Sequence, residues 1–580
     1  MSQPDPANPL IVHADRTVVL ETFHPRAEAA RVAIAPFAEL ERSPEHLHTY
    51  RITPLSLWNA ASAGHDGAAI VAALRRHSKF PLPPSLEVDV AELTSRWGRL
   101  RLATCDGELR LEVGEGEEPL LVEVARHDAV GPLLGPARGA RAFAVALGNR
   151  GVLKQALLRV GWPVQDVAGY HDGAALPLAL VDGLDVRAYQ EEAAEAFYQG
   201  GSAAGGSGVV VLPPGSGKTV VGLAAMARVR QRTLVLTTSR TSATQWRREL
   251  LSKTSLTPDQ VASFGAGRRK AVAPVTLCTY QMLTTRARGS AAVAGGPVDD
   301  GEPSYPHLDL MRQHDWGLIV YDEVHLLPAP VFRLTAEIQA RRRLGLTATL
   351  VREDGREGDV FSLIGPKRYD RPWRELERDG WIATADCCEV RLRLPEGERM
   401  DYALAEPRSR YRLAATTAAK DALVRAILAL HADAPALVIG QYLDQLERLA
   451  AELDAPLITG QTRQAERERL FDDFRAGRLS RLVLSKVGNF ALDLPDAALL
   501  VQVSGAFGSR QEEAQRLGRV LRPKARGAGA SFYTLVTRET DEETFAHHRQ
   551  RFLTEQGYAY RIMDAAEWLR PAPRPREQLN

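Results

Sequence analysis

The sequence predicts an α/β protein in which two parallel-sheet lobes follow α+β N-terminal domains. Three observations carry this prediction. Short apolar segments alternate with helical segments over residues 184–372, and they do so again over residues 415–564. Strands that are apolar throughout and are each followed by a helix are typical of parallel sheets covered on both faces. The chain of 580 residues is also too long for one core, so we expect several domains.

The same patterns, together with shifts in composition, predict six segments. They are an N-terminal α+β domain with a winged-helix-like docking unit (1–115), a small α+β domain (116–180), a first lobe (181–372), an inter-lobe segment (373–414), a second lobe (415–564) and a disordered Pro/Arg-rich tail (565–580).

The winged-helix-like unit is predicted from three segments with helical spacing and a hairpin that turns at Asp106-Gly107. These segments are 52–64, 67–76 and 87–97, with the hairpin at 100–113. Such a unit would dock nucleic acid or protein. A domain that only packs against its neighbours fits the same pattern. In the next segment we expect a strand at 120–125, a second strand at 142–147, and a helix that ends at Trp162-Pro163.

Composition and charge exclude several classes of protein. The 73 Lys and Arg residues nearly balance the 72 Asp and Glu residues, so a basic surface for nucleic acid would have to be local. The four Cys residues form no CxxC pair, which argues against a zinc framework or a disulfide scaffold and favours a reducing cytoplasm. No signal peptide is expected, and no apolar segment reaches the roughly 18 residues of a membrane span.

A phosphate-binding turn is predicted in the segment VVVLPPGSGKT, residues 209–219. Gly residues in this turn let the backbone bend around an anion without a Cβ clash, and a helix start follows. Lys218 would reach the β- and γ-phosphates of ATP, and the Thr219 hydroxyl would hold Mg²⁺. A strict P-loop has Gly where Leu212 stands, and a purely structural turn is the alternative for this motif alone. The expected ATP-binding residues of the turn are Pro214, Gly215, Ser216, Gly217, Lys218 and Thr219.

Two carboxylates follow the apolar strand 317–321 in the sequence DEVH. The carboxyl ends of parallel strands meet at one edge of a sheet, so Asp322 and Glu323 should face the same crevice as Lys218. We expect Asp322 to hold Mg²⁺ through water, and Glu323 to orient and deprotonate the attacking water. His325 would couple this site to a polynucleotide by hydrogen bonds, and a core or surface histidine is the alternative.

Two residues upstream of the turn are candidates for contact with the nucleotide base. Arg187 and Gln190 lie in LDVRAYQEEAAEAF, which has helical spacing. A Gln side chain can read an adenine edge because it carries both a donor and an acceptor. An exposed helix face is the alternative for both residues.

Further polar residues at predicted strand ends are candidates for contact with nucleic acid. Thr347 and Thr349 follow the strand RRLGLTAT and would bridge the Glu323 side of the site to a nucleic-acid groove. Two more groups end successive strand–helix units and are interpreted as contacts to a polynucleotide backbone: Gln245-Trp246 and Thr279-Tyr280-Gln281.

The second lobe lacks a phosphate-binding turn but contains a basic helix, QEEAQRLGRVLR, at 511–522. Gln515, Arg519 and Arg522 are spaced i, i+4 and i+7, so they share one face. Arginine is always charged and binds phosphate oxygens with two N–H groups, so this face would supply arginine fingers to the nucleotide. Gly518 permits close approach to that face, and a generic basic helix is the alternative.

In this order and spacing the motifs resemble those of superfamily 2 helicases, and more narrowly those of the bacterial form of the XPB DNA repair helicases. Arg352, Glu353 and Asp354 match the RED motif, which is associated with strand separation in that family. The segments that carry the resemblance are DEVHLLPAPVFR (322–333), RRLGLTATLVREDGREGDVFSLIGPKRYD (342–370), SGAFGSRQEEAQRLGRVLRPK (504–524) and PFAELERSPEHLHTYRITPLSLWNA (36–60).

The resemblance implies two RecA-like lobes and ATP-dependent 3′–5′ unwinding of duplex DNA, together with strand annealing, in nucleotide excision repair. It implies ATP and Mg²⁺ as cofactors, and single-stranded DNA or duplex DNA with a 3′ tail as the partner. Residues around 90–180 would correspond to a damage-recognition-like region, and 373–413 is the candidate for a thumb. The sequence shows no acidic nuclease cluster, so any nuclease or further repair protein is expected to be a separate partner.

Two other functions are compatible with the sequence. The long N-terminal region fits a DNA-dependent ATPase or translocase that acts as an assembly factor with little unwinding. An RNA helicase is the third interpretation, and it is disfavoured because the second lobe and Arg352–Asp354 resemble XPB. Strand displacement from a 3′-tailed duplex, and stimulation of the ATPase by DNA compared with RNA, would distinguish the three.

Overall fold

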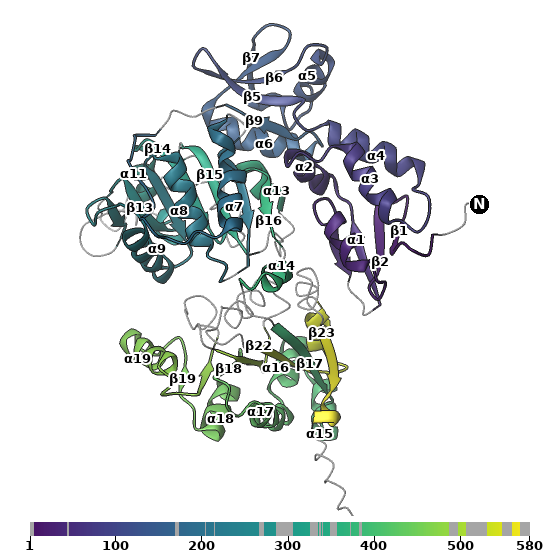
Figure 1. Cartoon of the computed structure of the whole chain (residues 1–580), viewed down its shortest axis with the longest axis vertical. Helices are drawn as coiled ribbons and strands as arrows, with labels where there is room; N and C mark the ends of the chain where they lie inside the picture. Colours follow the sequence, from purple (N-terminus) through teal and green to yellow (C-terminus); the bar gives the residue numbers. More distant parts are fainter. Residues whose placement is uncertain are drawn as a thin grey trace, which may run out of the picture. The chain divides into compact units, whose positions relative to one another are not determined.

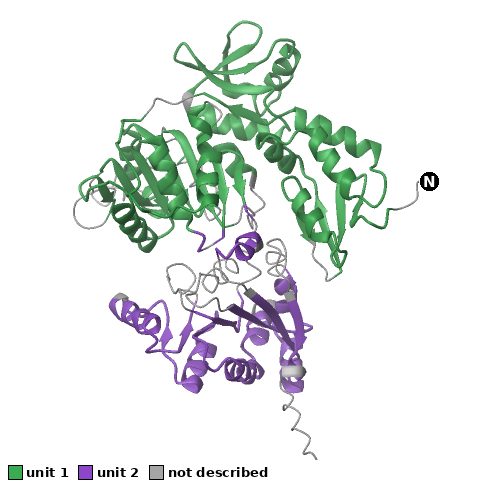
Figure 2. Ribbon diagram, viewed as in Figure 1, with its two compact units in different colours: residues 1–212, 217–370 green, residues 213–216, 371–580 purple. Residues whose placement is uncertain are grey.

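The chain forms two compact units in the computed structural model (Figure 2). Unit 1 comprises Met1–Leu212 and Gly217–Asp370, and unit 2 comprises Pro213–Ser216 and Arg371–Asn580. The structure describes residues 5–42, 46–168, 173–202, 205–213, 215–265, 272–285, 305–324, 335, 338, 340–348, 357–371, 373–381, 385–485, 497–505, 530–547 and 560–568.

An antiparallel sheet with the strand order β1-β2-β4-β3 and four helices form the first region of unit 1 (Figure 1). Helix α2 begins where its sequence predicts, because the Thr53 hydroxyl accepts a hydrogen bond of 3.0 Å from the Ser56 amide and Pro54 opens the first turn. The three helices predicted here are confirmed. The elements are β1 (Leu10–Val12), β2 (Thr17–Glu21), α1 (Ala27–Ile34), β3 (Glu39–Arg42), β4 (Leu47–Arg51), α2 (Pro54–Ser62), α3 (Gly67–His77) and α4 (Pro84–Ser95).

A five-stranded sheet with the order β7-β8-β6-β5-β9 forms the second region. The predicted hairpin is confirmed, and its turn residues Asp106 and Gly107 have φ values of 54° and 77°. The hairpin shares this sheet and its core, so the predicted boundary at residue 115 is wrong and the hairpin forms no winged-helix-like unit with α2–α4. The elements are β5 (Leu100–Cys105), β6 (Glu108–Val113), α5 (Glu118–Ala125), β7 (Leu134–Ala137), β8 (Ala142–Val145), α6 (Arg150–Arg159) and β9 (Val164–Asp166).

The strand predicted at 120–125 is also wrong, because this segment lies in helix α5. Leu120, Leu121 and Val124 are buried, which is the i, i+1, i+4 pattern of a helix face. An apolar run this short does not distinguish the strand period from the helix period.

Seven parallel strands form the sheet of the first lobe, in the order β12-β13-β11-β14-β15-β10-β16, as the sequence predicts. Strands β14, β15 and β10 lie side by side, so their carboxyl ends share one edge. The strands are β10 (Ser207–Val211), β11 (Thr233–Thr237), β12 (Val261–Ser263), β13 (Val275–Thr279), β14 (Trp316–Asp322), β15 (Ala340–Thr347) and β16 (Lys367–Asp370). The helices are α7 (Ala188–Tyr198), α8 (Lys218–Val229), α9 (Arg240–Lys253), α10 (Tyr280–Leu283), α11 (Pro306–Arg312) and α13 (Glu357–Leu363).

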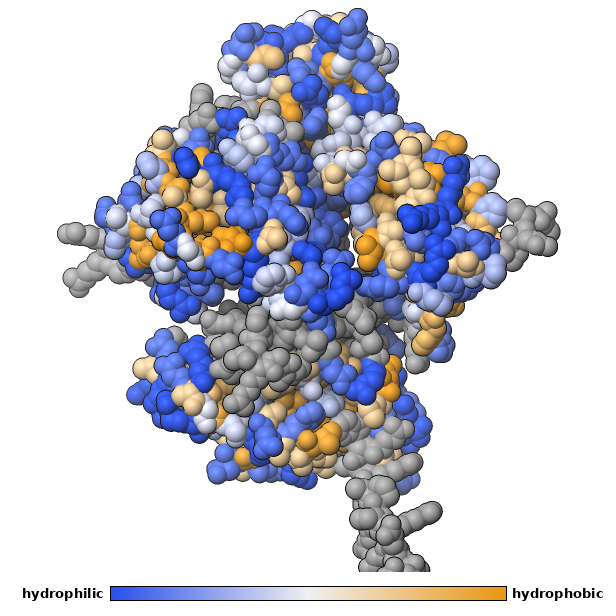
Figure 3. All heavy atoms as spheres, viewed as in Figure 1, coloured by the Kyte–Doolittle hydropathy of each residue, from blue (hydrophilic) through white to orange (hydrophobic). Residues whose placement is uncertain are grey.

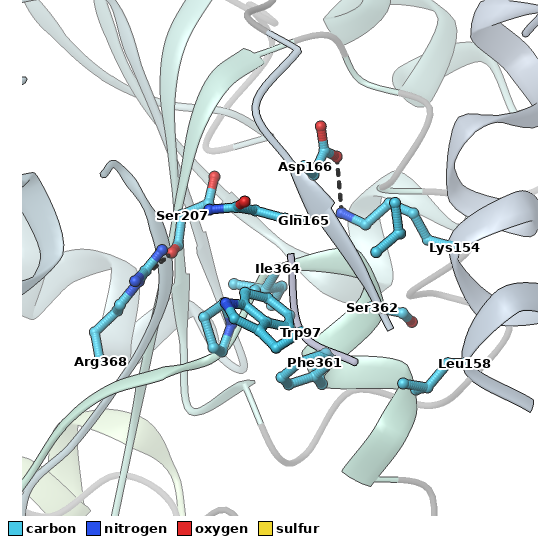
Figure 4. Close-up of a pocket in the computed structure, with 13 residues that line it drawn as sticks. Trp97, Lys154, Leu158, Gln165, Asp166, Ser207, Phe361, Ser362, Ile364 and Arg368 are labelled. Atoms are coloured by element: carbon cyan, nitrogen blue, oxygen red, sulfur yellow. Dashed lines mark hydrogen bonds and ion pairs between the residues drawn. The ribbon is translucent and has the colours of Figure 1, made fainter. Parts of the chain in front are cut away.

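The N-terminal regions contact the first lobe at α13 and at the edge strand β16. The Gln155 side chain donates to Asp359 Oδ1 at 3.1 Å, and the Lys367 amide donates to Asn59 Oδ1 at 3.0 Å. The rings of Trp97 and Phe361 meet edge to face, with centroids 5.5 Å apart. Figure 4 shows these two rings beside a small cavity, which the ion pair of Lys154 and Asp166 also lines.

Seven parallel strands form the sheet of unit 2, in the order β19-β20-β18-β21-β22-β17-β23. The strands are β17 (Ala385–Leu392), β18 (Ala436–Ile439), β19 (Leu457–Ile458), β20 (Arg481–Leu484), β21 (Leu499–Gln502), β22 (Ala530–Thr537) and β23 (Tyr560–Asp564). The helices are α14 (Trp373–Arg378), α15 (Glu396–Leu404), α16 (Pro407–Thr416), α17 (Ala419–Leu430), α18 (Leu443–Leu453), α19 (Gln464–Arg475) and α22 (Ala565–Trp568). The second parallel sheet is thus confirmed, and the chain contains two RecA-like lobes.

Two predicted segments of unit 2 are corrected. Strand β17 comes from the predicted inter-lobe segment 373–414, yet it pairs with β22 along its whole length and also with β23. It is therefore an integral strand of the second sheet and not part of a thumb. The first four residues of the tail predicted as disordered, 565–568, form α22.

A buried ion pair lies in the core of unit 2. Lys420 and Glu542 are both fully enclosed, and the Lys420 ammonium lies 2.8 Å from each Glu542 carboxylate oxygen. The ammonium also donates to the carbonyl oxygens of Val503 at 2.9 Å and Leu535 at 3.3 Å. The carboxylate accepts a further hydrogen bond of 3.0 Å from the Thr537 amide. This network joins α17 to the ends of β21 and β22.

Hydrophilic residues predominate on the face of unit 1 in Figure 3, with apolar residues interspersed over α3 and α4. Exposed apolar side chains of this part include Phe80 and Val88. Within the residues that the structure describes, no helix is long and apolar enough to cross a membrane.

Candidate functional site

The predicted phosphate-binding turn joins β10 to α8. Gly215 and Gly217 both have a φ of 82°, a conformation that side chains disfavour, so Gly is required at both positions. The Ser216 hydroxyl donates to the carbonyl oxygen of Pro213 at 2.6 Å, which closes the turn on itself. Helix α8 begins at Lys218, with Thr219 in its first turn, so its free amides lie where the sequence predicts.

Gln190 lies directly against this turn. A Cβ atom on Gly217 would lie 2.5 Å from Gln190 Nε2, so the two residues are in close contact. Gln190 is buried, and its Oε1 accepts a hydrogen bond of 3.1 Å from the Arg187 amide. The sequence predicts that Arg187 lies in a helix. In the structure it is the residue before α7. The structure therefore places Gln190 against Gly217, and Arg187 beside Gln190.

Lys218 and Glu323 form the centre of the candidate site. The Lys218 ammonium lies 3.4 Å from Glu323 Oε1, and it donates to the Leu212 carbonyl oxygen at 3.4 Å. Glu323 follows β14 with a φ of 51°, in the left-handed region that costs a non-Gly residue about 1–2 kcal/mol. The Tyr280 hydroxyl donates to the Asp322 carbonyl oxygen at 2.9 Å, just before this strained residue. Backbone strain of this kind gathers at functional sites.

Asp322 is the last residue of β14, as predicted. Its Oδ2 accepts hydrogen bonds from Ser242 Oγ at 2.8 Å and from Trp246 Nε1 at 3.1 Å. Burial and the adjacent Glu323 charge raise the pKa of Asp322, while these hydrogen bonds and Lys218 lower it.

Thr347 completes this edge of the sheet. It ends β15, pairs with Val211, and accepts a hydrogen bond of 3.0 Å from the Leu212 amide at its carbonyl oxygen. In the pairing of β14 with β15, Asp322 lies opposite Leu346, the residue before Thr347. The ends of β10, β14 and β15 thus meet as predicted.

Two of the residues predicted to contact a polynucleotide backbone behave differently from the prediction. Trp246 and Tyr280 are buried, with 1% and 5% of their surface exposed, so the prediction that they contact a polynucleotide is wrong. Both instead bond to Asp322. Ser242 was missed altogether, although its i, i+4 spacing to Trp246 places the two on one face of a helix. Gln245 and Gln281 are exposed, and their DNA contacts stay predictions.

Several predicted site residues lie outside the residues that the structure describes: Pro214, His325, Thr349, Arg352, Glu353, Asp354, Gln515, Arg519 and Arg522. Among the described residues, no three His, Cys, Asp or Glu side chains gather in a way that would hold a metal ion alone. The oxygen atoms at Thr219 and Asp322 are nevertheless of the kind that Mg²⁺ prefers, since this ion usually takes one or two carboxylates and completes its shell with phosphate and water.

Comparison with known proteins gives matches along most of the chain. A family model described as "ERCC3/RAD25/XPB C-terminal helicase" matches residues 376–573, which include the second sheet. One described as "Type III restriction enzyme, res subunit" matches residues 183–352 in the first lobe. A third, "Helicase conserved C-terminal domain", matches residues 10–138 in the N-terminal regions.

Similar proteins extend over nearly the whole sequence. The chain is 57% identical to a DNA 3′-5′ helicase XPB of Kineococcus radiotolerans, covering 96% of both chains. It is 55% identical to the DNA 3′-5′ helicase XPB of Mycobacterium tuberculosis, over 97% of this chain and 99% of that one. It is 30% identical to the general transcription and DNA repair factor IIH helicase/translocase subunit XPB/SSL2 of Saccharomyces cerevisiae, over 97% of this chain and 73% of that one. With this identity along its length and these motifs at one sheet edge, the chain belongs to the XPB family of DNA 3′–5′ helicases.

Proposed function

We propose that this protein is an ATP-driven 3′–5′ DNA helicase that remodels duplex DNA in nucleotide excision repair. The observation that carries the proposal is the meeting of Lys218, Asp322 and Glu323 at the carboxyl edge of the first sheet. Phosphoryl transfer needs positioning and charge stabilisation more than covalent chemistry, and these three groups supply both.

Lys218 is the group that contacts the β- and γ-phosphates of ATP. The Lys218 ammonium lies 3.4 Å from Glu323 in this structure, and it would leave this contact to bind phosphate oxygens when ATP is present. The Glu323 carboxylate could then orient and deprotonate a water molecule. Thr219 and Asp322 would hold Mg²⁺, which neutralises phosphate charge when it is bound. The amides of Gly215, Ser216 and Gly217 would bind the anion, because successive backbone N–H groups in such turns form anion-binding concavities. The positive φ of both Gly residues is compatible with a turn of this kind.

The remaining roles are proposed from the sequence. Arg187 and Gln190 recognise the base, and the contact of Gln190 with Gly217 supports a position beside the nucleotide. Gln515, Arg519 and Arg522 complete the site from the second lobe. Six residues couple ATP hydrolysis to DNA: His325, Thr347, Thr349, Arg352, Glu353 and Asp354.

We propose that the substrate is single-stranded DNA or a duplex with a 3′ tail, and that a nuclease or other repair protein acts as a separate partner. The four cysteines are free, which agrees with the proposed cytoplasmic location.

A polarity-defined unwinding assay tests the proposal. The ATPase rate is measured with and without single-stranded DNA, and with RNA, alongside displacement of strands from duplexes with a 3′ or a 5′ tail. We expect stimulation by DNA and displacement only from the 3′ tail. Lys218→Ala should abolish both activities. DNA-stimulated ATPase without displacement would favour the assembly-factor function instead, and stimulation by RNA alone would contradict the proposal.

A further inference from the structure

Two side chains of one helix, α9, donate hydrogen bonds to the Asp322 carboxylate. We propose that Ser242 and Trp246 are positioning residues, which fix the Asp322 carboxylate in the orientation that receives the Mg²⁺ of bound ATP. This inference rests on the proposed function of Asp322 and deepens it.

The geometry of the bonds leaves one carboxylate oxygen for the metal. Both donors, Ser242 Oγ at 2.8 Å and Trp246 Nε1 at 3.1 Å, end on Oδ2 of Asp322. Neither bond uses Oδ1. An Asp side chain rotates about two torsions, and two donors that approach one oxygen from the same helix face restrict both. Oδ1 receives neither of these bonds and would therefore be the atom that contacts the water shell of a bound ion.

Trp246 is itself fixed by the helix that carries the phosphate-binding residues. A Cβ atom on Gly222 of α8 would lie 2.5 Å from Cη2 of the Trp246 ring, and 3.3 Å from Cδ1 of Leu346 in β15. The ring thus fills the space between α8 and the sheet, and only 1% of Trp246 is exposed. Since α8 begins at Lys218, the packing that places the ammonium also places the donor to Asp322.

Ser242 is held at the start of α9. The Ser239 side chain caps this helix and accepts a hydrogen bond of 3.1 Å from the Ser242 amide. The cap fixes the backbone of the first turn, so the Ser242 hydroxyl approaches the carboxylate from a defined position. Groups that orient a metal ligand typically contribute about 10- to 100-fold to metal affinity.

The test removes each donor in turn. Ser242→Ala deletes the hydroxyl, and Trp246→Phe deletes the N–H together with the outer ring carbons that lie against Gly222. We expect the Mg²⁺ concentration for half-maximal ATPase to rise about 10-fold or more in each variant. Binding of a fluorescent ATP analogue, measured without turnover, should weaken in Mg²⁺ and stay at the wild-type level in EDTA.

Two matched variants control for loss of a hydroxyl and of an indole. Thr244→Ala removes an exposed hydroxyl of α9 that bonds only within the helix, to the Arg240 carbonyl oxygen at 3.0 Å. Trp316→Phe removes a buried indole N–H that donates to the Met311 carbonyl oxygen at 2.8 Å, away from Asp322. Both controls should keep the wild-type dependence on Mg²⁺.

The outcomes separate this inference from the proposed function. A wild-type protein without DNA-stimulated ATPase overturns the proposed function and this inference with it. An active wild-type protein whose Ser242→Ala and Trp246→Phe variants follow the two controls in Mg²⁺ dependence overturns the inference alone. If Trp246→Phe fails to fold, Ser242→Ala decides, because its half-buried side chain can be shortened without opening the core.

Discussion

The buried ion pair of unit 2 allows a stability prediction whose size follows from the structure. Lys420→Met removes the ammonium and keeps an unbranched apolar chain of similar length. The Glu542 carboxylate would then stay in the core with the Thr537 amide at 3.0 Å as a remaining donor, and the Val503 and Leu535 carbonyl oxygens would lose theirs. Removing one partner of a buried ion pair costs about 3–5 kcal/mol. That is a large share of the roughly 5–15 kcal/mol that stabilises a domain.

Hydrogen exchange measured by mass spectrometry can report the loss of stability of unit 2 separately from that of unit 1. This matters because the two units need not unfold together. Amides of β21 and β22 should exchange about 10²- to 10⁴-fold faster in Lys420→Met, whereas those of β10 and β14 should not change. Arg412→Met is the control, because Arg412 pairs with Asp444 at 3.0 Å on the surface, where an ion pair contributes about 1 kcal/mol at most. Replacing Glu542 as well, by Leu, should recover part of the loss. If Lys420→Met accelerates exchange no more than Arg412→Met does, the reasoning from burial is refuted.

Three further outcomes are expected. Glu323→Gln should bind ATP normally in a filter assay and lower the turnover rate about 10²- to 10⁴-fold, because the water loses its base; normal turnover would contradict the assigned role. Burial raises the pKa of the Cys278 thiol to about 12, so iodoacetamide at pH 8 should modify the partly exposed Cys105 first; equal rates in tryptic peptides would oppose this. Burial lowers the pKa of His48 from 6.5 to about 4, so its folded pKa lies below the unfolded one. The N-terminal region should therefore be fully stable above about pH 6.5 and become protease-sensitive as the pH falls toward 4, and His48→Phe should remove that pH dependence.

The sequence predicts most of what lies within single strand–helix units. Both parallel sheets follow from apolar strands, and the positions of Lys218 and Asp322 follow from the strands that precede them. Strand β17 could not be assigned in this way, because its partners β22 and β23 lie far along the chain and no local pattern specifies them. The direction in which Trp246 points depends on the space above Gly222 in another helix, so the sequence showed an aromatic residue without showing that it faces inward.

The packing of the N-terminal regions on α13 and β16 also determines how far this chain can be shortened. A protein beginning at residue 181 would retain every strand of the first sheet. Its Phe361 ring would lose the cover of Trp97, and the Lys367 amide on the edge strand would lose the Asn59 side chain. Uncovered sheet edges pair with other chains and promote aggregation. The N-terminal regions therefore cover the edge strand β16, and a truncated protein without them would be prone to self-association through this strand.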